Sequence, residues 1–423
     1  MPTRRFCALL VLALVLYFFA NQTQVGWLYI MVGLLFGVMF IAYRLNRKGS
    51  EGVNVDISLP GPDRQLWEGD LVTWEARFSS IAGHGSYQYQ IGLENPLEDP
   101  QSEAAVRYWL LPHISEDGIS LKEETVLYKR GLHHFETGWC ITRFPFGLFT
   151  RGREIGDPNQ MPALLVYPEL RELDQFLLLD EKQRQEAIRP KIGYSHEVLS
   201  VRPYRHGDSP RHIHWRSTAR AGQLISKEFA ADADQGVTLW IEPNVPLYLY
   251  GEKEVGDSDR DWEDRFSLFQ RIKANPFELG VKVAASIGEY ALRMRYPLFL
   301  ADEDGPRGAV SADLLWPYLA RIEPHYLESD EDEILPEPAR ISPSHLIYLI
   351  PFPTEMAIRR AIALKETRRQ LTVILIDQGS FPMVNELFET VPAAEKMAGE
   401  LIANQIETIV IGNNEDWIEK LSA

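Results

Sequence analysis

The sequence contains almost no cysteine. Only Cys7 and Cys140 occur among 423 residues, the first inside an apolar run and the second far along the chain. Two such distant thiols provide no disulfide framework, and their scarcity excludes a cysteine-based zinc site. We therefore expect a protein that folds in a reducing compartment.

Positive charge is also in short supply. The chain has 43 Lys and Arg against 60 Asp and Glu, which gives a formal net charge of −17. Repulsion between this net charge and phosphate disfavours non-specific binding to nucleic acid. We predict that no nucleic acid is a partner.

Several catalytic and nucleotide-binding motifs are missing. The sequence has no Gly-x-x-x-x-Gly-Lys-Ser/Thr loop, no Gly-x-Ser-x-Gly elbow and no His-Glu-x-x-His pair. It therefore does not bind ATP through a P-loop, and it lacks the usual hydrolase and zinc-protease sequence patterns. We expect a binding protein rather than an enzyme.

Two apolar runs occupy the N-terminus. The first extends from Phe6 to Ala20 and the second from Val25 to Tyr43, with the polar stretch Asn21–Gln24 between them. A helix that crosses a membrane needs about 20 apolar residues, so the second run is long enough and the first is slightly short. Residues 1–48 are therefore predicted to form a hairpin of two membrane-spanning helices.

Basic residues flank the outer ends of this hairpin, at Arg4, Arg5, Arg44, Arg47 and Lys48. The positive-inside rule places both ends in the cytoplasm, together with everything from Gly49 onward. A cleaved signal peptide is the alternative. No small-x-small cleavage site follows Ala20, and a second span comes almost at once, so we favour the hairpin.

The stretch from Val53 to about Pro168 has the pattern of strands. After the turn Glu68-Gly69-Asp70, apolar residues alternate with polar ones at Val72, Trp74, Ala76 and Phe78, and the alternation recurs at Tyr87, Tyr89 and Ile91. Period-two alternation is typical of half-buried strands. We predict an immunoglobulin-like antiparallel β-sandwich over residues 49–172.

The pattern changes after Gly236. Short apolar runs at 237–241, 298–300, 346–350, 371–376 and 408–411 alternate with helical periodicity at 277–295, 313–321, 356–367 and 395–403. Such alternation indicates a parallel sheet covered by helices on both faces. We predict a doubly wound α/β domain over 236–423 and a connector over 173–235 that begins with a charged helix. The whole chain is then an α+β multidomain protein.

The connector carries the densest group of functional residue types. These residues are Tyr204, Gly207, Asp208, Arg211, His214, Trp215, Arg216, Arg220, Glu228 and Phe229. A tyrosine, Gly-Asp, an arginine, Ile-His-Trp, Ser/Thr-Ala-Arg and Glu-Phe follow one another in the order found in the domain of unknown function 58 family. The segment therefore resembles that bacterial and archaeal family. Pro145-Phe146-Gly147-Leu148-Phe149 resembles an earlier signature of the same family, with Phe144 in place of the usual acidic residue.

The resemblance implies a β-sandwich followed by a von Willebrand factor A-like domain, in a protein of the bacterial inner membrane. It also implies association with MoxR-type AAA+ ATPases. It supplies no reaction, because the family's activity is unsettled. The function we expect is a membrane-anchored cytoplasmic scaffold or adaptor that binds such an ATPase.

Three interpretations of the signature segment are open. In the one we favour, the segment is an interdomain clamp in which Asp208 pairs with an arginine and Trp215 fills the seam between domains. A second is docking of a partner protein. The third is an enzyme or binding site for anionic, phosphate-bearing substrates, with His214 as the acid–base group beside Arg211 and Arg216. We assign no catalytic residue.

A metal site is the last question. In von Willebrand factor A domains an Asp-x-Ser-x-Ser motif after the first strand binds a divalent cation, and the matching residues here are Glu242, Asn244 and Pro246. Proline offers no side-chain oxygen, and Mg²⁺ needs about six oxygen ligands. We expect no cofactor. The alternative is Mg²⁺ held by Glu242, Asn244 and Asp377.

Overall fold

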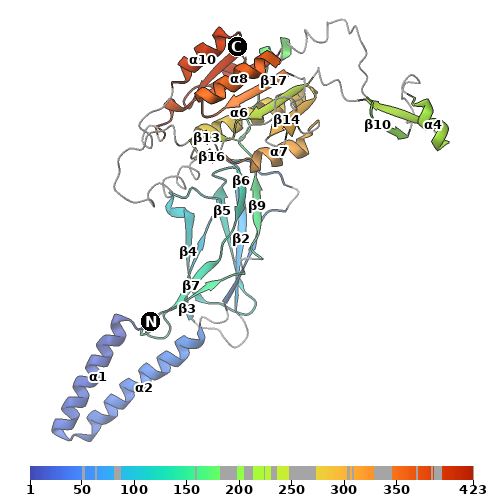
Figure 1. Cartoon of the computed structure of the whole chain (residues 1–423). Helices are drawn as coiled ribbons and strands as arrows, with labels where there is room; N and C mark the ends of the chain where they lie inside the picture. The colour runs from blue at the N-terminus through green and yellow to red at the C-terminus, as the bar shows by residue number, and fades with distance from the viewer. Residues whose placement is uncertain are drawn as a thin grey trace. The chain divides into compact units, whose positions relative to one another are not determined.

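The computed structural model describes residues 1–49, 53–61, 64–80, 87–157, 160–181, 198–203, 213–222, 224–229, 236–246, 273–302, 305–306, 309–327, 345–367, 370–382, 384 and 393–422. The chain divides into two compact units, Met1–Tyr167 and Pro168–Ala423. Figure 1 shows the helical hairpin and the β-strands of the first unit, and the helices and sheets of the second.

The hairpin consists of α1 (Arg4–Thr23) and α2 (Gly26–Gly49). Both helices are long and apolar enough to cross a membrane, which makes the hairpin compatible with membrane anchoring. Helix α1 has 20 residues and is longer than its apolar run. It continues through Asn21–Thr23 and ends at Gln24, whose left-handed backbone lets its N–H donate to Ala20 O. At about 1.5 Å per residue, α1 spans roughly 30 Å, so the first helix is not short for a membrane.

Two antiparallel sheets follow the hairpin. One has the order β1-β2-β5, formed by Val53–Ser58, Leu71–Ser80 and Ile119–Val126. The other has the order β4-β3-β7-β8, formed by Val106–His113, Tyr87–Glu94, Gly138–Thr142 and Arg151–Ile155. A further pair joins β6 (Gly131–His134) to β9 (Ala163–Val166). A short 3-10 turn at Glu103–Ala105 precedes β4.

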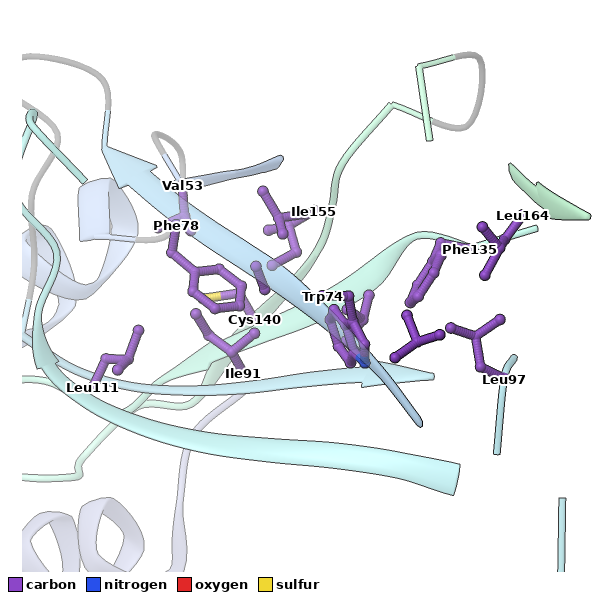
Figure 2. Packing of buried hydrophobic residues seen from close by; sticks show 14 of the residues in the cluster. Val53, Trp74, Phe78, Ile91, Leu97, Leu111, Phe135, Cys140, Ile155 and Leu164 are labelled. Atoms are coloured by element: carbon purple, nitrogen blue, oxygen red, sulfur yellow. The ribbon is translucent and has the colours of Figure 1, made fainter. Parts of the chain in front are cut away.

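The two sheets share one core, as a sandwich does. Trp74 and Phe78 of β2 pack in the same buried cluster as Ile91 of β3 and Cys140 of β7 (Figure 2). Val72, Trp74, Ala76 and Phe78 are all buried, which confirms the alternation predicted for this strand. Period-two patterning therefore identified the inner face of the sheet correctly.

The second unit contains a six-stranded sheet with the order β15-β14-β12-β17-β18-β19. Its strands are Gly305–Pro306, Leu298–Asp302, Val237–Ile241, His345–Ile350, Leu371–Asp377 and Glu407–Gly412. Every pairing is parallel except that of β15 with β14. The predicted parallel sheet is therefore confirmed. The strands β12 and β17 are buried along their whole length, as expected for a sheet covered on both faces.

Helices accompany this sheet as the sequence predicted. The helices at predicted positions are α6 (Pro276–Arg293), α7 (Ala312–Arg321), α8 (Glu355–Thr367) and α10 (Ala394–Ala403). A further helix, α11 (Trp417–Ser422), follows the last strand and was not predicted. Side chains of α8 and α10 share a buried cluster with β17 and β18. Helix α6 packs closely against α7, because a Cβ at Gly288 would lie 2.7 Å from Leu315 Cδ2. A 3-10 turn, η7 (Gln378–Ser380), follows β18.

The start of the second unit differs from the predicted charged connector. Leu173, Phe176 and Leu179 are fully buried, so this segment is part of the core and not a solvent-exposed charged helix. Asp180 accepts hydrogen bonds from Tyr290 Oη at 2.6 Å and Tyr296 Oη at 3.1 Å. Burial, and then the hydrogen bond to Asp180, raise the pKa of Tyr290 to about 12. Residues 182–197 of the predicted connector lie outside the described residues.

Glu169 and Arg171 also contact α6, although the sequence placed them at the end of the sandwich. Lys282 Nζ donates to Glu169 Oε2 at 2.9 Å, and the Arg171 backbone N–H donates to Ser286 Oγ at 3.2 Å. Burial alone would raise the pKa of Glu169. The hydrogen bond and positive charge of Lys282 outweigh that effect and lower the pKa.

Candidate functional site

The signature segment folds as a helix between two paired strands. Strands β10 (Val198–Pro203) and β11 (Ile225–Phe229) are antiparallel, and α4 (Trp215–Ala221) lies between them in the chain. The His214 backbone N–H donates to Ile225 O at 2.8 Å, and the Ile225 N–H donates to Thr218 Oγ1 at 3.0 Å. These two bonds hold α4 on the first residue of β11.

His214 caps the N-terminus of α4. Its Nδ1 accepts the backbone N–H of Ser217 at 3.2 Å and lies 2.7 Å from Ser217 Oγ. A ring nitrogen that accepts a backbone N–H carries no proton, so neutral His214 has its hydrogen on Nε2. The contact satisfies one of the backbone donors that every helix start leaves without a partner in the helix. A capping role thus accounts for the position of His214 without acid–base chemistry.

The outward face of α4 is aromatic and cationic. The Trp215 side chain is 66% exposed, and Arg216, Ala219 and Arg220 are exposed as well. Arg216 and Arg220 stand one helical turn apart, so their guanidinium groups extend from the same side of the helix. We call Trp215, Arg216, Ala219 and Arg220 the α4 face.

Other predicted site residues cannot be placed in this geometry. Tyr204, Gly207, Asp208 and Arg211 fall outside the part of the chain that the structure describes. The predicted pairing of Asp208 with an arginine therefore stays a prediction. The packing of Trp215 in a seam between domains also stays a prediction, and within the described residues its side chain is 66% exposed. Glu228 and Phe229 lie in β11, where they pair with Ser200 and Val198 of β10.

The capping role predicts how two substitutions of His214 differ. His214→Ala removes the cap and is expected to destabilise α4 by about 1 kcal/mol, whereas His214→Asn keeps a good capping side chain and costs much less. Hydrogen exchange of α4 amides in the full-length protein measures both effects. An equal loss of protection in the two variants would show that the imidazole does more than cap the helix.

A second group of polar side chains lies at the carboxyl end of β12. After β12 the chain forms β14 and β15 on one side of it and then crosses to form β17 on the other side. Strands β12 and β17 therefore border the topological switch point. Ligands of open α/β sheets bind in the crevice at such a point. Glu242 follows β12 directly, is 2% exposed and donates its backbone N–H to Leu349 O at 2.8 Å.

Side chains of three residues donate hydrogen bonds to the Glu242 carboxylate. Arg360 Nη1 and Tyr348 Oη both donate to its Oε2, and Asn244 Nδ2 donates to its Oε1 at 2.6 Å. The Arg360 guanidinium carbon lies 6.0 Å from the ring centroid of Trp240, which stacks on Tyr348 with centroids 4.2 Å apart. Burial, and then the charge of Glu242, raise the pKa of Tyr348 well above its usual value. Tyr348 therefore stays protonated and donates to the carboxylate.

These residues do not fit a magnesium site. Both Glu242 oxygens accept hydrogen bonds, one of them from a guanidinium whose positive charge would repel a divalent cation. Asp377 ends β18, which is separated from β12 by β17, and its side chain accepts the N–H of Gly379 at 3.2 Å. Among the described residues, no three His, Cys, Asp or Glu side chains form a group that could hold a metal.

The sequence interpretation named Glu242 but missed Tyr348 and Arg360. Tyr348 lies in the middle of the apolar run 346–350, from which the sequence predicted only a strand. Arg360 stands three residues after Ala357 and four before Leu364, both of which are buried. An arginine on the apolar side of a helix requires a buried partner, and this was the available indication.

Comparisons with known proteins add little about activity. The crystal structure of Spo0M, a sporulation control protein from Bacillus subtilis, is 10% identical, with a TM-score of 0.15, and the match covers 36% of this chain and 58% of that one. A GH20 exo β-N-acetylglucosaminidase from Vibrio harveyi is 11% identical, with a TM-score of 0.20 and coverage of 77% and 57%. The chain thus spans less than two thirds of either protein, and these scores carry no argument.

The search of curated proteins found no match. Residues 200–250, which include α4, β11 and β12, match the family model described as "Protein of unknown function DUF58". This match supports the assignment of the chain to the DUF58 family, whose motif order the signature segment follows.

Proposed function

We propose that this protein is a membrane-anchored scaffold or adaptor that docks a partner protein through the α4 face. The observation that carries the proposal is the 66% exposure of Trp215 on a helix that two hydrogen bonds to Ile225 hold on strand β11. Tryptophan and arginine are the residue types that most often dominate binding energy at protein interfaces. The α4 face presents both on one short helix.

The sheet of the second unit supports a von Willebrand factor A-like fold in this proposal. Numbered along the chain from β12, its strands have the order 3-2-1-4-5-6, with only the edge strand antiparallel. In such a domain, the guanidinium of Arg360 supplies the positive charge beside Glu242 at the switch point. We therefore propose that partner binding needs no bound metal ion.

The proposed partner is a MoxR-type AAA+ ATPase in the cytoplasm. The family resemblance motivates this choice, and the basic ends of the hairpin favour a cytoplasmic location for both units. Arg216 and Arg220 suit carboxylates on the surface of that partner, because a guanidinium can donate two parallel hydrogen bonds to one carboxylate.

Affinity purification of the full-length protein from native membranes in mild detergent tests the proposal. We expect the intact protein to retain an AAA+ ATPase, and we expect Trp215→Ala and Arg216→Glu to lose it. Removing a central aromatic anchor typically costs at least about 2 kcal/mol, or more than tenfold in affinity. Mass spectrometry of the eluted proteins identifies and quantifies the ATPase.

Two exposed residues of α7 supply matched controls. Leu314, which is 62% exposed, and Arg321 are replaced as Leu314→Ala and Arg321→Glu, and both variants should retain the ATPase. Thermal melting of all four variants checks that their folds are intact. The proposal fails if no AAA+ ATPase accompanies the intact protein, or if the α4 variants retain as much of it as the controls do.

A further inference from the structure

The loop between β7 and β8 lies against the open ends of the helical hairpin. We call residues 144–149 the wedge loop. Thr3, which caps α1, donates its backbone N–H to Leu148 O at 3.0 Å and its hydroxyl to Gly147 O at 2.7 Å. Pro2 forms a β-bridge with Phe149. The N-terminus of the first helix is therefore joined to the wedge loop by backbone contacts.

The second helix is joined to the same loop near its other end. Asn46 of α2 is only 4% exposed, and its Nδ2 donates to Phe144 O at 2.9 Å and to Phe149 O at 3.3 Å. The amide thus binds both ends of the wedge loop. A buried amide placed on two backbone carbonyls fixes the loop on α2, because releasing it would leave polar groups without partners.

The wedge loop continues the apolar surface of the two spans. Leu148 is 2% exposed and belongs to the buried cluster that contains Ala13, Met39 and Ala42 of the hairpin. The Phe149 ring lies 4.9 Å from Phe6 and 5.6 Å from Tyr43, measured between ring centroids. Phe6 follows Arg5 and Tyr43 precedes Arg44, so Phe149 packs on the apolar side of the flanking arginines.

The tip of the loop exposes a phenylalanine. Phe146 is 68% exposed and has a φ of 60°, a left-handed conformation that is uncommon for a bulky residue. The contacts of Leu148, Phe149 and Asn46 hold the backbone on either side of it in place. The fold therefore keeps an apolar ring outside the core, beside helices that are themselves apolar.

Exposed arginines flank the wedge loop and the hairpin ends that contact it. Arg5 and Arg143 are exposed, and a Cβ placed on Gly147 would lie 3.0 Å from Arg5 Nη1, so the guanidinium reaches the loop. Arg44 and Arg47 are exposed at the end of the second helix, and neither α1 nor α2 contains an acidic residue. An exposed apolar residue on a segment flanked by arginines is typical of segments that bind at the interface of an anionic bilayer.

We propose that the wedge loop is a third membrane-contacting element, with Phe146 in the boundary between headgroups and acyl chains and with Arg5 and Arg143 on anionic phospholipid headgroups. The inference rests on the proposed membrane anchoring and extends it from the helices to the sandwich. The bilayer would then fix the orientation of the sandwich, because both helix ends and the β7–β8 loop meet the membrane together.

A fluorescent probe at Phe146 tests the proposal in the full-length protein. Phe146→Cys is made in a Cys7→Ser background and labelled with an environment-sensitive maleimide dye. Cys140 does not compete, since it is buried and burial raises the pKa of its thiol to about 12. In phosphatidylglycerol nanodiscs we expect blue-shifted emission, and several-fold quenching when the acyl chains carry bromine.

Leu71→Cys in the same background is the matched control. Leu71 is 55% exposed at the start of β2, and its dye should emit as in water and resist quenching by bromine. Emission at position 146 that equals emission at position 71 overturns the proposal. A blue shift that appears in native membranes, but not in nanodiscs that contain only this protein and lipid, also overturns the proposal. In that case a partner protein, and not lipid, would cover the probe at position 146.

Two further measurements distinguish a failure of the membrane anchoring from a failure of the wedge loop proposal. Resistance of the protein to carbonate extraction tests anchoring by the helices, so a protein that is washed off contradicts the anchoring itself. If the protein stays in the bilayer and the probe at position 146 is aqueous, only the wedge loop proposal fails. Arg5→Gln with Arg143→Gln should lower the share of phosphatidylglycerol that co-purifies, and an unchanged share contradicts the assignment of headgroup contacts.

Discussion

Replacing Arg360 with alanine is expected to lower the free energy of unfolding of the second unit by about 3–5 kcal/mol, because it leaves a buried carboxylate without its cation. Glu242 is 2% exposed, and the Arg360 side chain is 9% exposed. Hydrogen exchange of β12 and β17 amides in the full-length protein measures the effect. A local measurement is needed because two compact units need not unfold together.

The neighbouring residue on α8 provides the control. Arg359 forms a 3.8 Å ion pair with Glu355, but both side chains are highly exposed, at 74% and 83%. Arg359→Ala should therefore change stability by no more than about 0.5 kcal/mol. Replacing both members of the buried pair, as Glu242→Leu with Arg360→Met, should recover much of the loss. Equal effects of Arg360→Ala and Arg359→Ala would contradict the buried pair.

Trp74→Ala should destabilise the sandwich by about 3–5 kcal/mol, which is the cost of removing a large buried aromatic side chain. The Trp74 ring is 1% exposed and lies 5.2 Å from the Phe135 ring between centroids (Figure 2). Its Nε1 donates to Thr125 Oγ1 at 3.1 Å, and Asn95 Nδ2 donates to the same hydroxyl. Hydrogen exchange of β2 and β5 amides reports the loss.

A smaller change at the same position separates packing from hydrogen bonding. Trp74→Phe keeps an aromatic ring and removes the donor, and we expect it to cost clearly less than Trp74→Ala. Leu110→Ala on β4 should change stability by no more than about 0.5 kcal/mol, since its side chain is 80% exposed. If Trp74→Ala behaved like Leu110→Ala, the tryptophan would not support the core that both sheets share.

The elements of both units were predictable because their patterns are local. Val72 to Phe78 alternate with the period of a strand, and the run from Val237 to Ile241 is apolar at four of five positions because both faces of β12 are covered. The two apolar helices followed from length and composition. The residues at which these helices begin and end could not be predicted in the same way. Capping residues such as Thr3 and Gln24 set the ends of α1, and they lie outside the apolar run.

The candidate sites were predictable only in part. The signature segment was found from the order of its residues, and the exposure of Trp215 came from the structure. His214 illustrates the limit, because its contact with the N-terminus of α4 depends on where the helix begins, and that came from the structure. Its proposed acid–base role stays a prediction.

By itself, then, the sequence determined the apolar hairpin, the strand and helix patterns and the family-like segment, all of which depend on residues close together in the chain. Only the tertiary structure decided the partner of Glu242, since Arg360 lies 118 residues away. It also decided that the loop at Leu148 packs against Thr3, which is 145 residues away. Such contacts depend on how separate elements pack together, and periodicity along the chain carries no record of that packing.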